Sequence, residues 1–259
     1  MLNQTVFSRL LLIICLSFFL IGQGYSEELS ATQIVQKVDD LMNQPSSYAK
    51  AKMTIITSSG KERTFEYDSW SKNKGEKNLM RYLAPHRVKD QATLMLNNAD
   101  DIWMYFPRTN RVRKLASHAK KQKMEGSDFS YEDMGSGDSF LKDYTSKKMD
   151  DQKIDNADCY QVELIRKSDS DVSYSRLILF VRKDNFVPIR ILYYDEDDTS
   201  KLLKELTQSH IEVIQNIPTA MFLDMKNESD NTHTTMELES IKYNLDLDDA
   251  MFTERGLKK

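Results

Sequence analysis

The sequence is poor in cysteine, glycine and proline. It has 2 cysteines, 8 glycines and 5 prolines among 259 residues. Cys15 lies in the apolar run at the amino terminus, so removal of that run leaves Cys159 alone and excludes an intrachain disulfide. The glycines form no repeat, and no stretch has the composition of a linker. We therefore expect one domain over residues 27–259 that is stabilised by its core.

Motifs of common catalytic and metal sites are also missing. The chain has no G-x-S-x-G elbow, no H-E-x-x-H, no C-x-x-C and no phosphate-cradling glycine loop. Its 4 histidines lie far apart, and the acidic residues between 128 and 133 lack the spacing of a calcium loop. A pair of carboxylates brought together in space, as in some hydrolases, is left open. We expect that the protein is not an enzyme and that it binds no cofactor and no metal.

The chain lacks an excess of positive charge. Its formal net charge is -4 and its isoelectric point is about 5.7, which argues against a nucleic-acid partner. The charge is polarised locally, because basic residues between Arg108 and Lys123 precede acidic residues between Glu125 and Asp138. These segments are either two solvated surfaces that neutralise each other or a docking rim for anionic headgroups or a protein partner.

A long apolar run occurs at the amino terminus. Arg9 precedes the run from Leu10 to Ile21, and the small residues Gly24 and Ser26 allow cleavage before Glu27. This is the layout of a secretory signal peptide over residues 1–26, cleaved near Ser26. The run is shorter than the roughly 20 apolar residues that span a membrane. We therefore expect export of the mature chain.

The first segment of the mature chain has the pattern of an amphipathic helix. Ser30 and Gln33 have the spacing of a capping box, and Pro45 stops the pattern. One face of the helix carries apolar residues at helical spacing, namely Ile34, Val38, Leu41 and Met42. The sequence predicts a helix over residues 30–43.

Beyond Pro45 the hydrophobic period changes to two. Alternation over residues 49–55, 65–67, 92–96 and 160–164 predicts half-buried strands. Short turn signals separate them, which favours an antiparallel meander because parallel strands need long crossovers. Residues 202–213 fit a short helix or a strand, and we favour the strand.

Several of these strands are apolar on both faces. Ile102 and Met104 alternate with Trp103, so both faces of that strand need a covering. The helix at 30–43 supplies one covering. The other is either a ligand or the side chains of a barrel that fills its own interior. We place six residues in an apolar cavity: Met53, Phe65, Leu94, Leu96, Trp103 and Tyr105.

Two further groups of residues are assigned around that cavity. We expect Phe129 and Tyr131 to anchor a lid, with Ser130 capping a short helical turn over the cavity mouth. The docking rim consists of four basic residues: Arg108, Arg111, Arg113 and Lys114.

The order of several motifs resembles one known family. The motifs are R-Y-L-A-P at 81–85, D-I-W-M-Y-F-P at 101–107, R-V-R-K at 111–114 and G-S-D-F-S-Y-E-D at 126–133, with N-L-D-L-D-D-A-M-F-T at 244–253. Together they span most of the mature chain. They resemble the LolA-like family described as outer-membrane lipoprotein-sorting proteins, in a branch distinct from the lipoprotein carrier LolA proper.

The resemblance implies a fold and a compartment. The fold is mainly β: a curled antiparallel meander forming an incomplete barrel, with the N-terminal helix and short helices covering its open mouth. The compartment is a Gram-negative periplasm. Members of this branch are often associated with transporters of the resistance-nodulation-division superfamily.

The function expected from these features is carriage of lipid or lipoprotein acyl chains between membranes, as carrier or accessory protein. The transporter is the expected protein partner, with transient contact to a membrane surface. We expect a monomer that binds no nucleic acid. The alternative is a sensor or adaptor module that binds a transporter or envelope protein without carrying lipid.

Overall fold

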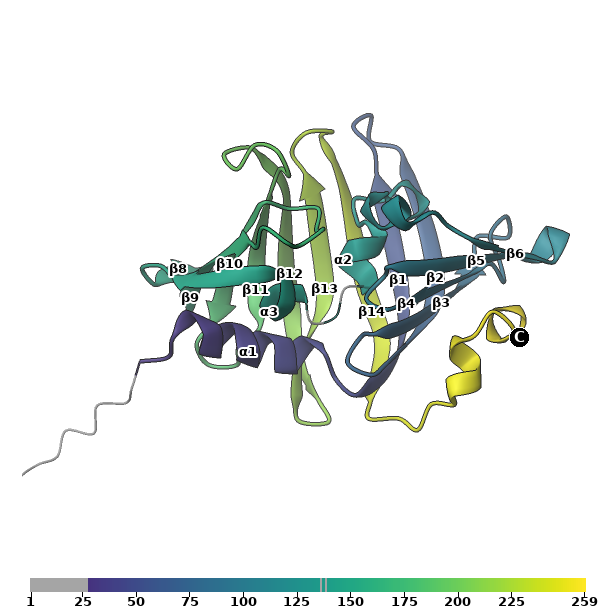
Figure 1. The fold of residues 1–259 in the computed structure, drawn as a ribbon, viewed down its shortest axis with the longest axis horizontal. Helices are drawn as coiled ribbons and strands as arrows, with labels where there is room; N and C mark the ends of the chain where they lie inside the picture. Colours follow the sequence, from purple (N-terminus) through teal and green to yellow (C-terminus); the bar gives the residue numbers. More distant parts are fainter. Residues whose placement is uncertain (1–27, 136, 138) are drawn as a thin grey trace, which may run out of the picture.

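The computed structural model describes residues 28–135, 137 and 139–259 (Figure 1). The expected signal peptide over residues 1–26 lies outside the described residues. Within the described part of the chain, none of the helices has both the length and the apolar composition needed to cross a membrane.

The predicted N-terminal helix is α1 (Ala31–Met42). The Ser30 hydroxyl accepts a hydrogen bond from the Gln33 amide, and the Gln33 side chain accepts one from the Ser30 amide, so the predicted capping box is present. The helix ends at Met42 with Asn43 as its C-cap, two residues before Pro45. Ile34, Val35 and Val38 are fully buried on the face that packs against the sheet.

The rest of the described chain is mostly strand. The strands are β1 (Ser46–Ile56), β2 (Glu62–Lys72), β3 (Lys77–Ala84), β4 (Ala92–Leu96), β5 (Asp101–Phe106), β6 (Arg111–Lys114), β7 (Tyr144–Lys148), β8 (Gln152–Ile154), β9 (Ala157–Arg166), β10 (Arg176–Arg182), β11 (Pro188–Tyr194), β12 (Leu202–Ile214), β13 (Ile217–Asn227) and β14 (Thr232–Tyr243). Short helices fill the connections: α2 (Tyr131–Gly135), α3 (Ser139–Asp143), and the 3₁₀ turns η1 (Pro107–Thr109), η2 (Ser117–Lys121), η3 (Met124–Gly126), η4 (Asp249–Phe252) and η5 (Gly256–Lys258).

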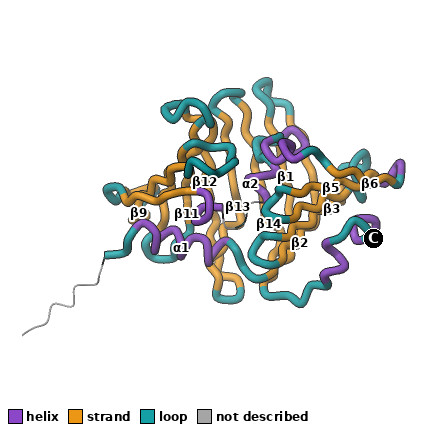
Figure 2. The backbone as a smooth tube through the Cα atoms, viewed as in Figure 1, coloured by secondary structure: helices purple, strands orange, loops and turns teal. Residues whose placement is uncertain are grey.

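These strands form a single antiparallel sheet with the order β6-β5-β4-β3-β2-β1-β14-β13-β12-β11-β10-β9-β7, and β8 pairs with β9. The sheet curls around the short helices (Figure 2). Its end strands β6 and β7 do not pair with each other within the described residues, so the sheet stays open. The predicted incomplete barrel is therefore confirmed, and residues 202–213 form a strand, as predicted.

The face of the sheet that packs against α1 and α2 is called the inner face here. Over β1 to β4 this face is filled by the chain's own side chains, and Phe65, Tyr67 and Tyr82 are almost completely buried. Their rings meet edge to face, with centroids 5.8 Å (Phe65 to Tyr82) and 6.0 Å (Tyr67 to Tyr82) apart. This half of the open barrel has a packed interior.

The opposite, outer face of β2 to β5 is covered by the carboxyl-terminal segment. Phe252 in η4 and Leu257 in η5 are buried against Leu79 and Leu94. The segment lies beside these strands in Figure 1, where it is drawn in yellow. The second apolar face of these strands is thus covered by the chain itself.

Candidate functional site

A cavity of about 340 Å³ lies between the inner face of the sheet and the three α-helices. This volume falls in the lower part of the range of about 300–1,000 Å³ found for small-molecule sites. Most of the apolar residues in the wall formed by the sheet come from the five neighbouring strands β10 to β14: Leu177, Ile191, Tyr193, Leu206, Leu223, Met225 and Met236. The sheet also contributes the polar residues Ser47, Ser71, Asn78 and Gln208. The opposite wall includes Met42, Phe129, Met134 and Phe140.

The cavity wall combines rigid and adaptable side chains. Tyr174 and Tyr193 meet edge to face with ring centroids 4.9 Å apart. Burial raises the pKa of both phenols well above its usual value, so their hydroxyl groups stay protonated. Met225 and Met236 lie on the adjacent strands β13 and β14, and methionine side chains adapt to apolar guests of variable shape.

The segment 127–135 contributes one wall of this cavity and is called the lid segment, or lid, below. Phe129 is 3% exposed and contributes to the lining. Ser130 caps α2: its hydroxyl accepts a hydrogen bond from the Asp133 amide (3.1 Å), and its amide donates to Asp133 Oδ2 (2.7 Å). The predicted cap at Ser130 is confirmed. At the other end of the lid, Asn43 Nδ2 donates to the Gly137 carbonyl oxygen at 2.7 Å, which ties α1 to the connection after α2.

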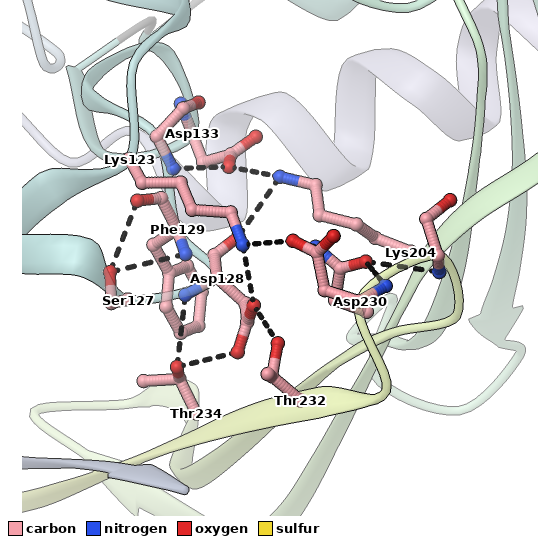
Figure 3. A network of polar contacts seen from close by, with 12 residues as sticks. Lys123, Ser127, Asp128, Phe129, Asp133, Lys204, Asp230, Thr232 and Thr234 are labelled. Atoms are coloured by element: carbon pink, nitrogen blue, oxygen red, sulfur yellow. Dashed lines mark hydrogen bonds and ion pairs between the residues drawn. The ribbon is translucent and has the colours of Figure 1, made fainter. Parts of the chain in front are cut away.

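A buried ion pair fastens this lid to the sheet. Lys204 Nζ on β12 lies 2.6 Å from Asp133 Oδ2 and 3.1 Å from the Asp128 carbonyl oxygen (Figure 3). The Tyr174 hydroxyl donates to the other carboxylate oxygen of Asp133 at 2.8 Å. Lys204, Asp133 and Tyr174 together are called the latch below. Because a buried charge is stable only when it is paired and hydrogen-bonded, the latch favours the closed lid.

Asp128 provides a second anchor for the lid. Its side chain is 2% exposed and accepts hydrogen bonds from Thr232 Oγ1 (2.6 Å) and Thr234 Oγ1 (2.9 Å), both on β14 (Figure 3). Its amide also donates to Thr234 Oγ1 at 2.9 Å. Lys123 lies 3.3 Å from the same carboxylate. The acidic residues of this segment therefore hold the lid in place.

Glu132 is the third buried carboxylate of the lid. The amide of Ser173 donates to it at 3.0 Å, and the Ser173 hydroxyl donates to its other oxygen. Burial raises the pKa of Glu132, and the two hydrogen bonds from Ser173 oppose that rise. Burial thus disfavours the ionised form of Glu132 in the folded protein.

The fold is shared with known proteins. A family model described as "Uncharacterized protein" matches residues 74–259. The structure is similar to a DUF1329 family protein from Desulfovibrio piger, with 27% sequence identity and a TM-score of 0.79 over 88% of this chain and 97% of the other. The model covers more than half of the chain, so the chain belongs to the family that it describes, and its fold is LolA-like.

Two further LolA-like structures share the fold. One is a candidate outer membrane lipoprotein-sorting protein domain from Vibrio parahaemolyticus, with 23% identity and a TM-score of 0.79 over 88% of this chain and 98% of the other. The other is a LolA superfamily protein from Nitrosomonas europaea, with 22% identity and a TM-score of 0.73 over 88% and 99% of the two chains. No curated protein matches the sequence significantly.

The expected cavity residues of this LolA-like chain do not share one face. Met53 and Phe65 lie on the inner face, but they are fully buried in its packed half and do not line the cavity. The other four pack on the outer face against the carboxyl-terminal segment; they are Leu94, Leu96, Trp103 and Tyr105. Their assignment to the cavity was wrong because alternation groups residues by face without identifying which face looks inward.

The expected docking rim is also divided by the structure. Lys114 lies on the outer face, 2.5 Å from Asp101 and 4.8 Å from the ring centroid of Trp103. Arg111 is exposed on β6. Arg108 and Arg113 line a groove that also includes Arg87, which the sequence did not bring to attention.

The LolA-like chain shows no metal centre within residues 28–135, 137 and 139–259, because histidine, cysteine and carboxylate side chains form no cluster of three or more there. Cys159 is buried, and burial raises the pKa of its thiol, which makes it a poor nucleophile. Among the described residues, the site combines a mostly apolar wall with a covering segment held by polar contacts.

Proposed function

We propose that this protein is a periplasmic carrier or accessory protein that binds an acyl chain of a lipid or lipoprotein in the cavity beneath α1, α2 and α3. Residues 27–259 are its single domain, exported by the signal peptide at 1–26. The observation that carries the proposal is the apolar cavity enclosed by the sheet and the three helices. The LolA-like fold and the description of the Vibrio parahaemolyticus structure support it.

Binding in such a cavity is a partition between two apolar environments. Each methylene that leaves water contributes about 0.8 kcal/mol, so a chain with roughly ten buried methylenes gains about 8 kcal/mol. A bilayer offers the same chain a similar gain. Transfer therefore proceeds with little net change in free energy, and opening of the lid controls when it occurs.

Native mass spectrometry of protein purified from its own periplasm tests the proposal. We expect lipid adducts on the wild-type protein and far fewer on Leu206→Phe, because the larger side chain projects from β12 into the cavity. Leu94→Phe is the matched control, since it enlarges a buried leucine on the outer face and should keep the adducts. A wild-type protein without adducts would contradict the carrier.

The second candidate is a sensor or adaptor that carries no lipid. The packed interior between Met53, Phe65 and Tyr82 favours it, because half of the barrel has no room for a guest. In this case a resistance-nodulation-division transporter would contact the basic hairpin at 108–114 of the monomeric protein. The same mass spectra separate the two functions, because only the carrier retains lipid.

A further inference from the structure

A second groove, of about 300 Å³, lies where the β5–β6 hairpin meets the loop between β3 and β4. The described residues that line it include none that line the cavity. Three arginines contribute to it: Arg87 from the loop, Arg108 from the hairpin tip and Arg113 from β6. The groove collects three positive charges from segments that are separated in the sequence.

Within the part of the chain that the structure describes, these three arginines form no ion pair with an acidic residue. Elsewhere in the sheet, Arg166, Arg176, Arg182 and Arg190 each form an ion pair with a carboxylate. Among the described residues, the arginines of the groove form no such pair, and two of them, Arg87 and Arg113, contact aromatic rings instead. The Arg87 guanidinium lies 5.3 Å from the ring centroid of Phe65.

Arg113 has a corresponding contact on the hairpin itself. Its guanidinium lies 5.8 Å from the ring centroid of Phe106. Stacking of this kind orients a guanidinium and leaves its N–H groups able to bind an anion. Gln91, which also lines the groove, donates a hydrogen bond to Glu125 at 2.8 Å, and among the described residues Glu125 forms no ion pair with these arginines.

Apart from Gln91 and Thr109, the rest of the groove is apolar. Val88 is 5% exposed, and Phe106 and Pro107 are half-buried. A ligand that fits this lining carries a negative charge on an apolar stem. Arginine forks match the geometry of phosphate oxygens and bind them through paired hydrogen bonds.

The position of the groove indicates where such a ligand would come from. β6 is an end strand of the sheet, and the β5–β6 hairpin projects from one end of the molecule (Figure 1). The tip residues Arg108 and Arg111 are exposed there. We propose that this groove binds the phosphate of an anionic phospholipid at a membrane surface, with the first apolar atoms of the lipid against Phe106 and Val88.

The proposal is tested by binding of the mature protein to vesicles. Phosphatidylglycerol–phosphatidylcholine vesicles are compared with vesicles of phosphatidylcholine alone by cosedimentation at about 0.1 M salt, where charges more than about 10 Å apart are screened. The triple variant Arg87→Gln/Arg108→Gln/Arg113→Gln should bind the anionic vesicles roughly 100-fold more weakly, because each cation near such a surface contributes about fivefold. Thermal unfolding should be unchanged.

A charge-matched control separates the groove from general attraction. The control variant removes three exposed lysines that lie outside the groove and form no ion pair among the described residues: Lys147→Gln, Lys153→Gln and Lys242→Gln. We expect this variant to bind the anionic vesicles within about threefold of the wild type, since only screened long-range attraction is reduced. Equal losses in the two triple variants would overturn the proposal.

Three further measurements address the other occupants. Phe106→Ser should weaken vesicle binding without changing the charge, which a purely electrostatic surface would not show. Inorganic phosphate and poly-glutamate should each compete poorly with the vesicles. If poly-glutamate binds more tightly than the vesicles and the triple variant loses that binding, the occupant is an acidic protein and the proposal is wrong. Acyl-probe binding in the cavity should be unaffected, so failure here leaves the carrier proposal standing.

Discussion

Lys204 and Asp133 form a buried ion pair between the sheet and the lid. The two side chains are 9% and 4% exposed, and their charged atoms are 2.6 Å apart. Asp133 lies on α2 and Lys204 on β12, so the pair joins elements that are distant in the sequence. The Asp133 carboxylate also caps α2 through the Ser130 amide. Asp133 therefore both caps the helix of the lid and attaches the lid to the sheet.

Loss of Lys204 should release the lid. We expect Lys204→Met to lower the free energy of unfolding by about 3–5 kcal/mol, because it leaves the buried Asp133 charge without its cation. Adding Asp133→Asn should recover part of that loss, and Lys226→Met, an exposed lysine on β13, should cost little. Urea denaturation measures all three. Full additivity of Lys204→Met and Asp133→Asn would show that the pair is not coupled.

Glu132 should make the stability of the protein depend on pH. Its pKa is raised in the folded state by burial, so its stabilising contribution is complete below the unfolded value near 4.5 and is lost as pH rises through the folded pKa. Glu132→Gln removes the carboxyl group and with it this pH-dependent loss of stability. Relative to the wild type, the variant should therefore become more stable as pH rises from 4.5 towards neutrality.

Urea denaturation at several pH values measures this difference. Glu212→Gln is the control, because Glu212 is an exposed residue on β12 and its replacement also removes one carboxylate. A constant difference between Glu132→Gln and the wild type at every pH would contradict the role given to burial.

Local signals in the sequence predicted the elements that short-range chemistry determines. The capping box at Ser30 and the cap at Ser130 depend on residues three positions apart, and both are present in the structure. By sequence alone, residues 202–213 fit either a short helix or a strand. Lys204 lies in this segment, at an inward position among apolar residues, so the latch could not be found before β12 was placed beside β11 and β13.

The identity of the inward face could not be read from alternation. The pattern correctly separates Ile102 and Met104 from Trp103, but a strand with two apolar faces fits either orientation. The carboxyl-terminal segment determines which face is the outer one, because Leu257 packs against that face. Arg87 joins the groove with Arg113 for a similar reason: the contact follows from sheet order, which local sequence does not specify.

The environment of Trp103 should respond to the carboxyl-terminal segment and not to ligand in the cavity. In a Trp70→Phe background, an acyl ligand should leave the emission of Trp103 unchanged. Leu257→Ala should shift the emission to the red and lower stability by about 2 kcal/mol or more, because it removes a fully buried side chain from the cluster that covers Trp103. Leu257→Met keeps the volume and should have little effect. A shift in Trp103 emission on addition of an acyl ligand would contradict this placement and support the original assignment of Trp103 to the cavity.

Phe129 should control how long a ligand stays in the cavity. Its ring is buried, lines the cavity and belongs to a segment held by the latch on one side and by Asp128 on the other. Phe129→Ala opens space between lid and ligand, so we expect the dissociation rate of a fluorescent fatty-acid probe to rise on the order of tenfold for each 1.4 kcal/mol of lost contact.

A matched variant distinguishes this effect from general destabilisation. Phe252→Ala removes an equally buried phenylalanine from the outer face, and both variants should lose about 3–5 kcal/mol of stability. Only Phe129→Ala should speed probe release in stopped-flow dilution, because only Phe129 touches the cavity. If both variants release the probe at the same rate, the segment over the cavity is part of the core and does not act as a lid.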